Sequence, residues 1–205
     1  MKRQEADTSD VIGMEKTNKD LKFRRRMESV TDYRKRLELV KSGIDRLVVR
    51  KTNSRIIGQI IKYSPNGDIV IAHADSSELK KFDWSGRSNR PTAYLTGLLL
   101  AKKSRSKKGE RILDIGLASP VKNSIPFIFA KGCIDGGMEV RGNMDINDTI
   151  YNCSNTKYIS ELKSKDNSRY QKHYSAYLKS GVAPEDLAKV FNNAKDKINS
   201  EDLKQ

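Results

Sequence analysis

Hydrophobic residues recur along the first half of this chain as short runs separated by polar turns. Residues 47–49 and 55–61 are two apolar runs on either side of the polar segment 51–54, and residues 68–72 form a third run after the Pro-Asn-Gly segment 65–67. Short apolar runs flanked by turn residues are typical of β-hairpins, and Pro-Asn-Gly is a strong turn signal. The pattern therefore predicts an antiparallel meander of three strands.

A helix is expected directly before this meander. Thr31 is a suitable N-cap for a helix that begins at Asp32, whose carboxylate suits the positive end of the helix dipole. Tyr33, Leu37 and Val40 follow at helical spacing, so we expect them to form one apolar stripe. Most of the basic residues of the segment fall off that stripe and form its polar face.

Longer helical patterns follow the meander. Residues 91–101 predict a long apolar helix in which Gly97 permits close packing, and residues 111–117 predict a fourth strand. Residues 126–137 predict a second packing helix with Cys133 as a small buried residue. Strands alternating with helices after a meander indicate an α/β sandwich with a mixed sheet.

Three further amphipathic helices are expected near the end of the chain, around residues 156–162, 170–178 and 184–198. They pack either on the core or on a neighbouring protein. We accordingly divide the chain into a flexible N-terminal arm (1–21), an α/β core that binds a partner (22–140) and a helical C-terminal tail (141–205).

The distribution of charged residues indicates what kind of partner the protein binds. The 205 residues contain 40 Lys+Arg against 26 Asp+Glu, a net charge of +14. Residues 16–62 hold 15 basic and 5 acidic residues, and residues 80–111 hold 10 and 2, whereas residues 112–205 hold 13 and 12. A basic excess gathered in one half favours a polyanionic partner, with nucleic acid ahead of an anionic membrane surface.

Several function classes are disfavoured. No run of about 20 apolar residues is present, so we expect no membrane span, and the polar start of the sequence predicts a cytoplasmic protein without a secretory signal. Cys133, Cys153 and the two histidines lie too far apart for a zinc motif, and we expect neither a disulfide nor a metal nor another cofactor.

Candidate RNA-binding residues cluster in two places. The run 22–26 (Lys-Phe-Arg-Arg-Arg) concentrates like charges, which is costly without a counter-anion. The turn 51–54 carries Thr, Asn and Ser beside basic residues, and these side chains can bond phosphate, sugar or a base edge, although such residues also serve turn geometry alone. Trp84 could stack on a base, but packing over the sheet is the favoured interpretation.

The order of these motifs resembles the universal large-subunit ribosomal protein eighteen family, which binds 5S ribosomal RNA, in its archaeal and eukaryotic branch. The resemblance covers about residues 22–198 and is carried by the sequences at residues 23–26, 31–37, 41–43, 46–53, 93–99, 113–117 and 170–191. It implies a three-layer α/β/α sandwich of the ribonuclease H-like group, placed in the central protuberance of the large ribosomal subunit.

The resemblance and the charge pattern together define the expected partners and site. Partners would be 5S rRNA, large-subunit rRNA and neighbouring large-subunit proteins, including the other 5S rRNA binder, with no membrane. The candidate RNA-binding residues are Lys22, Arg24, Arg25, Arg26, Tyr33, Arg34, Arg36, Arg50, Lys51, Thr52, Asn53, Arg55, Ser76, Lys80, Arg87 and Asn89.

Two rival functions are weighed against this one. A ribonuclease H-like nuclease would need several carboxylates converging on two metals about 4 Å apart. Asp68, Asp114 and Asp135 are the obvious core candidates, but Asp114 has no acidic neighbour in sequence, and we expect it to bond backbone or a basic side chain. We therefore expect no enzyme. A non-ribosomal RNA-binding protein, or one that binds an acidic protein, is not excluded by composition.

Overall fold

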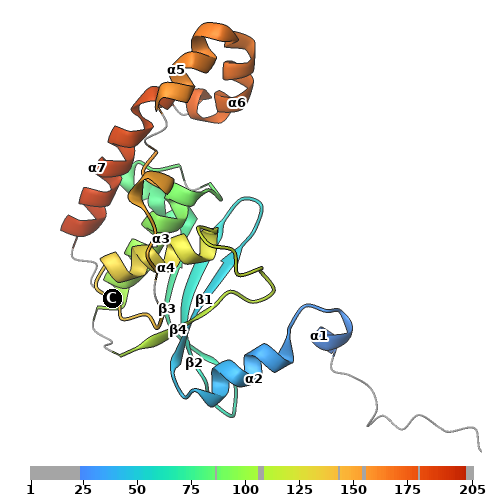
Figure 1. Ribbon diagram of the computed structural model, residues 1–205. Helices are drawn as coiled ribbons and strands as arrows, with labels where there is room; N and C mark the ends of the chain where they lie inside the picture. The colour runs from blue at the N-terminus through green and yellow to red at the C-terminus, as the bar shows by residue number, and fades with distance from the viewer. Residues whose placement is uncertain are drawn as a thin grey trace, which may run out of the picture.

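Four strands form one mixed sheet in the order β3-β2-β1-β4 (Figure 1). The computed structural model describes residues 24–85, 87–105, 109–142, 144–153, 156–179 and 181–201. Within them, β1 (Asp45–Lys51) pairs antiparallel with β2 (Ile56–Lys62) and parallel with β4 (Arg111–Asp114), and β2 pairs antiparallel with β3 (Ile69–Asp75). The predicted meander and the mixed α/β sheet are confirmed.

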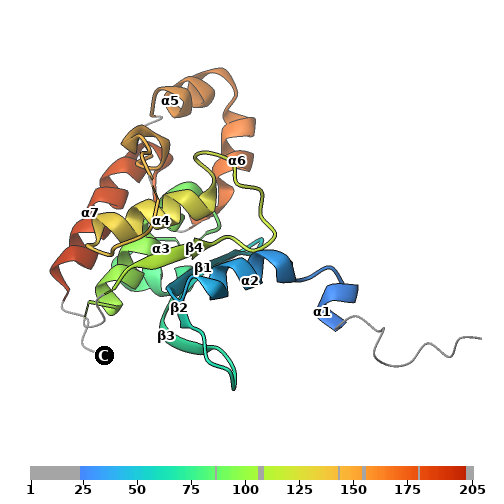
Figure 2. The ribbon, with the colours of Figure 1, turned by 60° about the horizontal axis from the view of Figure 1, so that its bottom comes forward.

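Two long helices cover one face of this sheet (Figure 2). They are α3 (Arg90–Lys103), which starts after the cap residue Asn89, and α4 (Ile125–Asp135). A Cβ at Gly97 would lie 2.2 Å from the Phe129 carbonyl oxygen, and one at Gly132 would lie 2.2 Å from that of Tyr94. The two helices therefore meet backbone to backbone, and the predicted role of Gly97 in close packing is confirmed.

Helix α7 (Leu187–Ser200) completes the core from the far end of the chain. Its Phe191 lies edge-on to Trp84, with ring centroids 5.8 Å apart, and Tyr94 stacks on Tyr151 at 4.3 Å. The Trp84 indole is buried and donates a hydrogen bond to the Thr92 hydroxyl (2.8 Å). Packing, rather than base stacking, is thus the confirmed role of Trp84.

Helix α2 (Tyr33–Lys41) lies on the side of the sheet opposite α3 and α4 (Figure 2), after the short helix α1 (Arg24–Met27). The predicted cap was wrong by one residue: Asp32 is the N-cap, and its carboxylate accepts from the backbone N–H groups of Arg34 and Lys35. The expected apolar stripe also fails to form a packed face, since no residue of α2 is buried and Leu37 is 53% exposed.

The remaining helices form a separate small unit and short connections. Helices α5 (Thr156–Lys165) and α6 (Asn167–Lys179) enclose their own apolar cluster of Ile159, Leu162 and Tyr170, with Tyr174 packed against it. Short 3-10 turns are η2 (Ser76–Phe82), η3 (Asp148–Ile150) and η4 (Pro184–Asp186). Of the predicted tail helices, the last packs on the core and the first two pack on each other.

The predicted N-terminal arm, together with Lys22, lies outside the described residues. The domain division at residue 140 and membership of the ribonuclease H-like group both stay predictions. Strand β4 ends at Asp114, three residues earlier than expected, because the chain turns at Gly116 (φ +63°). Within the described ranges no helix is both long and apolar enough to cross a lipid bilayer.

Candidate nucleic-acid interface

An arginine–aspartate network joins α2 to the open face of the sheet. Arg46 on β1 is only 3% exposed, and its guanidinium donates to Asp68 (2.6 Å) and to Asp114 on β4 (3.1 Å). Arg36 of α2 donates to the same Asp68 carboxylate (2.8 Å), and Arg50 reaches Asp114 (3.4 Å). Three cations thus meet two carboxylates, and the network ties α2, the β2–β3 turn, β1 and β4 together.

The network lowers the pKa of one of its acidic members, Asp68. Burial opposes ionisation of Asp68, but hydrogen bonds from Arg36 and Arg46 outweigh it and hold the pKa of this carboxyl below its ordinary value. Asp114 also accepts from the backbone N–H of Gly116 (2.9 Å). The prediction that Asp114 bonds backbone and basic side chains is therefore confirmed.

The tip of the β1–β2 hairpin is a tight, fully exposed turn. The backbone N–H of Thr52 donates to the Arg55 carbonyl (2.8 Å), and the Thr52 hydroxyl accepts from the Arg55 N–H (2.9 Å). This closure uses Thr52 for turn geometry and leaves Lys51 and Asn53 exposed beside the Arg55 guanidinium, which lies 3.9 Å from Asp75. The Arg50 guanidinium bonds the backbone carbonyls of Val49 and Asp114, so it anchors the base of this hairpin to β4.

Arginines of α1 and α2 point into solvent. The side chains of Arg24 and Arg34 are 85% and 92% exposed, and their acidic partners Glu28 and Glu38 are each four residues away on the same segment. Exposed pairs of this kind contribute about 0.3–0.5 kcal/mol at most, so they do little to hold the arginines in place. These cations remain available for a phosphate.

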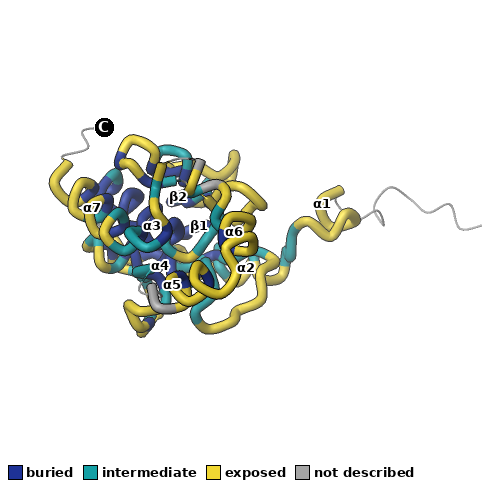
Figure 3. The backbone as a smooth tube through the Cα atoms, turned by 90° about the horizontal axis from the view of Figure 1, so that it is seen from above, coloured by how far each residue is buried: buried dark blue, intermediate teal, exposed yellow. Residues whose placement is uncertain are grey.

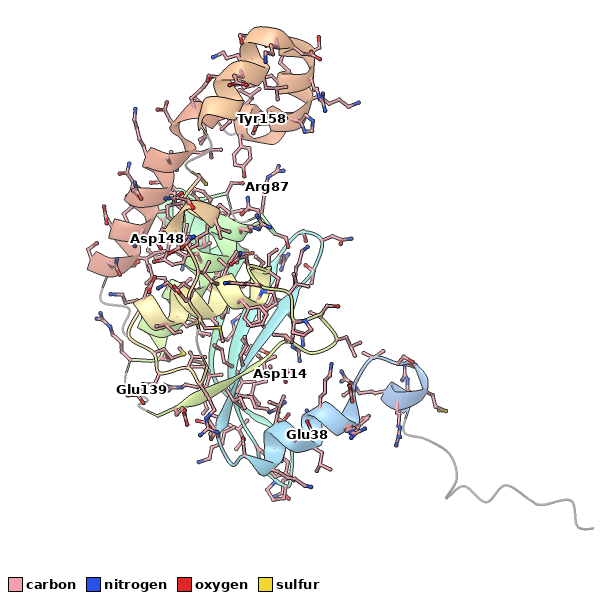
Figure 4. The ribbon with its side chains drawn as sticks, in the orientation of Figure 1. Glu38, Arg87, Asp114, Glu139, Asp148 and Tyr158 are labelled. Atoms are coloured by element: carbon pink, nitrogen blue, oxygen red, sulfur yellow. The ribbon has the colours of Figure 1, made fainter. Side chains whose placement is uncertain are left out.

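A third group of candidates lies at the start of α3. The Asn89 side-chain oxygen caps the helix by accepting from the Thr92 N–H, while its amide donates to the Tyr177 hydroxyl (3.0 Å). The exposed Arg87 guanidinium lies over the Tyr177 ring, 5.5 Å from its centroid (Figure 4). The Asn89 side chain is thus used by hydrogen bonds within the protein, whereas the Arg87 side chain is exposed to solvent.

Ser76 does not belong on the surface. It is fully buried, and its hydroxyl accepts from the backbone N–H of Ile56 (3.1 Å). Its place in the candidate set is corrected because this hydroxyl satisfies a buried strand N–H. Lys80, on η2, is exposed.

A comparison with protein families finds one match. The sequence model of the family described as ribosomal large subunit proteins 60S L5 and 50S L18 matches residues 17–111. The match contains the basic run, α2, the whole meander and α3, and it ends at the first residue of β4. Over these residues, slightly less than half of the chain, the sequence is similar to this family. The similarity supports a component of the large ribosomal subunit that has rRNA and ribosomal proteins as its partners.

The family match agrees with the geometry on the question of catalysis. The family consists of structural ribosomal proteins and not of enzymes. Asp68 and Asp114 are both held by the Arg46 guanidinium, and Asp135 accepts instead from the Tyr94 hydroxyl (2.9 Å). In the described part of the chain, no three His, Cys, Asp or Glu side chains converge as metal ligands would.

The structure also shows what sequence reasoning overlooked. Arg46 and Asp68 stood outside the RNA-binding candidate set, although Arg46 is the centre of the network that holds Arg36 and Arg50. The available signal was the alternation of β1, which places Arg46, Val48 and Arg50 on the face away from α3 and α4. Basic residues that are buried on a strand need acidic partners, and neighbouring strands and turns can supply them.

Proposed function

We propose that this protein binds 5S rRNA through α1, α2 and the β1–β2 hairpin tip, and anchors that RNA in the central protuberance. The observation that carries the proposal is the excess of exposed basic side chains on these elements. Residues 16–62 hold 15 basic against 5 acidic residues, and the side chains of Arg24, Arg34 and Arg55 are all mainly exposed.

The fold supports this surface by making it rigid at its base. Arg36 and Arg50 are tied to Asp68 and Asp114, so α2 and the hairpin keep a fixed relation to the sheet. A preorganised surface loses less conformational freedom on binding than a mobile one. The candidates with exposed side chains and no bond named above that holds them to the fold's interior are Arg24, Arg25, Arg26, Arg34, Lys51, Asn53, Arg55, Lys80 and Arg87. Tyr33, Arg36, Arg50 and Thr52 stay in the proposed set, although Arg36, Arg50 and Thr52 also form bonds within the fold, and Lys22 is retained from the sequence.

The proposal is tested with the full chain and a 5S rRNA transcript over a range of salt concentrations. A contact with about 6–10 phosphates should lose about 10³–10⁵-fold in affinity between 50 and 200 mM salt, because counterions released on binding must be recaptured. A salt-independent affinity, or no preference for 5S rRNA over an unrelated RNA of equal length, would refute the proposal.

A variant with Arg24, Arg25 and Arg26 changed to Ala addresses the residues themselves. Each lost phosphate contact should lower the slope of log affinity against log salt by about 0.9 or less. The matched control changes two exposed cations away from this surface, Arg141 and Lys189, to Ala, and should leave the slope unchanged. Thermal unfolding of the arginine variant should stay near that of the parent, since no residue of α1 is buried.

A further inference from the structure

The charge of the C-terminal half is balanced only as a sum. Residues 156–179, which form α5 and α6, hold six Lys+Arg against two Asp+Glu, whereas residues 112–155 hold three against five and residues 180–205 hold four against five. The basic excess of this half is therefore concentrated on one helical hairpin. Arg169 and Lys172, three residues apart on α6, are both exposed.

The same hairpin carries a row of tyrosines. Tyr170 and Tyr174 lie one turn apart on α6 with ring centroids 5.4 Å apart, and Tyr177 follows three residues later. Tyr158 of α5 contributes to the raised pKa of Tyr174, after the larger effect of burial. The row ends at Arg87, whose guanidinium covers the Tyr177 ring.

Burial separates the members of this row by role. Tyr170 is buried inside the α5–α6 cluster, and Tyr177 is held by its bond to Asn89, so both serve packing. Tyr158 is 51% exposed and contributes little to the cluster. Figure 4 shows its side chain leaving α5 on the side that faces Arg87. An open aromatic ring beside cations is the arrangement that binds unpaired bases by stacking.

The position of the hairpin extends the surface already described. Helix α6 lies above the β1–β2 tip in Figure 1, while α2 lies at the lower end of the molecule, and Figure 3 shows much of the α6 backbone as exposed. We propose that Tyr158, Arg87 and the basic face of α6 form a second RNA site, which takes an unpaired segment of ribosomal RNA by stacking and phosphate contact. The inference rests on the proposed rRNA-binding function and adds a class of ligand, single-stranded RNA, to it.

A protein partner is the competing occupant of an exposed aromatic surface. The charge of the hairpin favours RNA, because six cations against two acids repel basic ribosomal proteins and attract phosphate. Lys163 is already paired with Glu185 (2.8 Å) from outside the hairpin, so it belongs to the attachment of the unit and is left out of the site.

The test uses the full chain and a labelled single-stranded RNA of mixed sequence, about 10 nucleotides long, which matches the site sizes of such surfaces. Tyr158→Ala should lower the affinity at least about 5-fold, because stacking on an aromatic ring contributes that much or more per base. Tyr158→Phe keeps the ring and should keep the affinity. Leu178→Ala, at another exposed apolar position of the hairpin (40%, against 51% for Tyr158), should also keep it.

Each outcome decides something different. Unchanged affinity of Tyr158→Ala overturns the site and leaves a protein partner as the occupant, and an equal loss in Leu178→Ala overturns it by showing that the hairpin itself has been disturbed. Binding of 5S rRNA by the unmodified chain is measured in parallel with binding of the short RNA. If that binding is absent while the short RNA still binds through Tyr158, the proposed 5S function fails and the second site stands.

Discussion

Replacing Arg46 with Met should destabilise the fold far more than any other single change to the basic residues. Methionine matches the length of the arginine stem but leaves Asp114, whose side chain is 8% exposed, with the Gly116 N–H and with the partly exposed Arg50 at 3.4 Å as its remaining cationic partner. Removing one partner of a buried ion pair costs about 3–5 kcal/mol, because the other charge stays buried without compensation. Asp68 loses one of its two arginine partners at the same time.

This loss is large enough to measure by thermal unfolding, followed by circular dichroism or by the fluorescence of Trp84. For a chain of this size, 1 kcal/mol shifts Tm by about 2–4 °C, so the expected fall is about 6–20 °C. The control is Arg34→Met, whose arginine is exposed and lies 4.0 Å from Glu38, and its Tm should change by about 2 °C or less.

Two further measurements separate the network from its parts. Changing Arg46 to Met and Asp114 to Leu together should recover much of the stability, since a buried ion pair and an apolar pair of similar volume are often nearly equal in free energy. Because the pKa of the Asp68 carboxyl lies below its ordinary value of 3.8, the ionised carboxylate stabilises the fold at pH values above 3.8. This stabilisation is lost as the pH falls below 3.8 and through the lowered pKa. Arg46→Met should therefore show a shallower loss of stability in acid. A Tm within 2 °C of the parent would refute the structural role of Arg46.

Three other outcomes are expected. Gly97→Ala should cost about 1–3 kcal/mol in urea unfolding, because its Cβ would meet the Phe129 carbonyl at 2.2 Å and force α3 and α4 apart; a stabilised variant would contradict that contact. Asn53→Ala should weaken 5S rRNA binding by about 1 kcal/mol or more with unchanged Tm, whereas unchanged affinity would limit Asn53 to the turn. Burial raises the pKa of the Cys133 thiol far above its ordinary range and that of Cys153 to about 11, so iodoacetamide at pH 8 should modify both slowly in the native protein, Cys133 more slowly than Cys153, and both rapidly in urea.

Local features of the fold could be predicted from the sequence because their causes are local. The turn at residues 51–54 is closed by bonds between Thr52 and Arg55, three residues apart. The long helix α3 is buried along nearly its whole length, which matches an apolar segment of that size. Gly97 marked a close approach because a glycine inside an apolar helix needs a packing reason.

Features that depend on distant partners could not be predicted in the same way. Arg46 meets Asp68 and Asp114, which are 22 and 68 residues away in sequence, so the pairing needed strand order and register. Leu37 was expected to pack because of its spacing, but α2 rests on the sheet through the Arg36–Asp68 pair and buries no residue. The basic character of α5–α6 was hidden because the charge was summed over a longer segment.

Helix α7 has a consequence for how the chain matures. Phe191, Ala194 and Ile198 are core residues, yet they are synthesised after every element of the RNA-binding surface. Until they emerge from the translating ribosome, the rings of Trp84 and Tyr94 lack their contact with Phe191. The nascent protein thus carries its RNA-binding surface before its hydrophobic core is complete. The core is completed only when α7 leaves the ribosome and packs on α3.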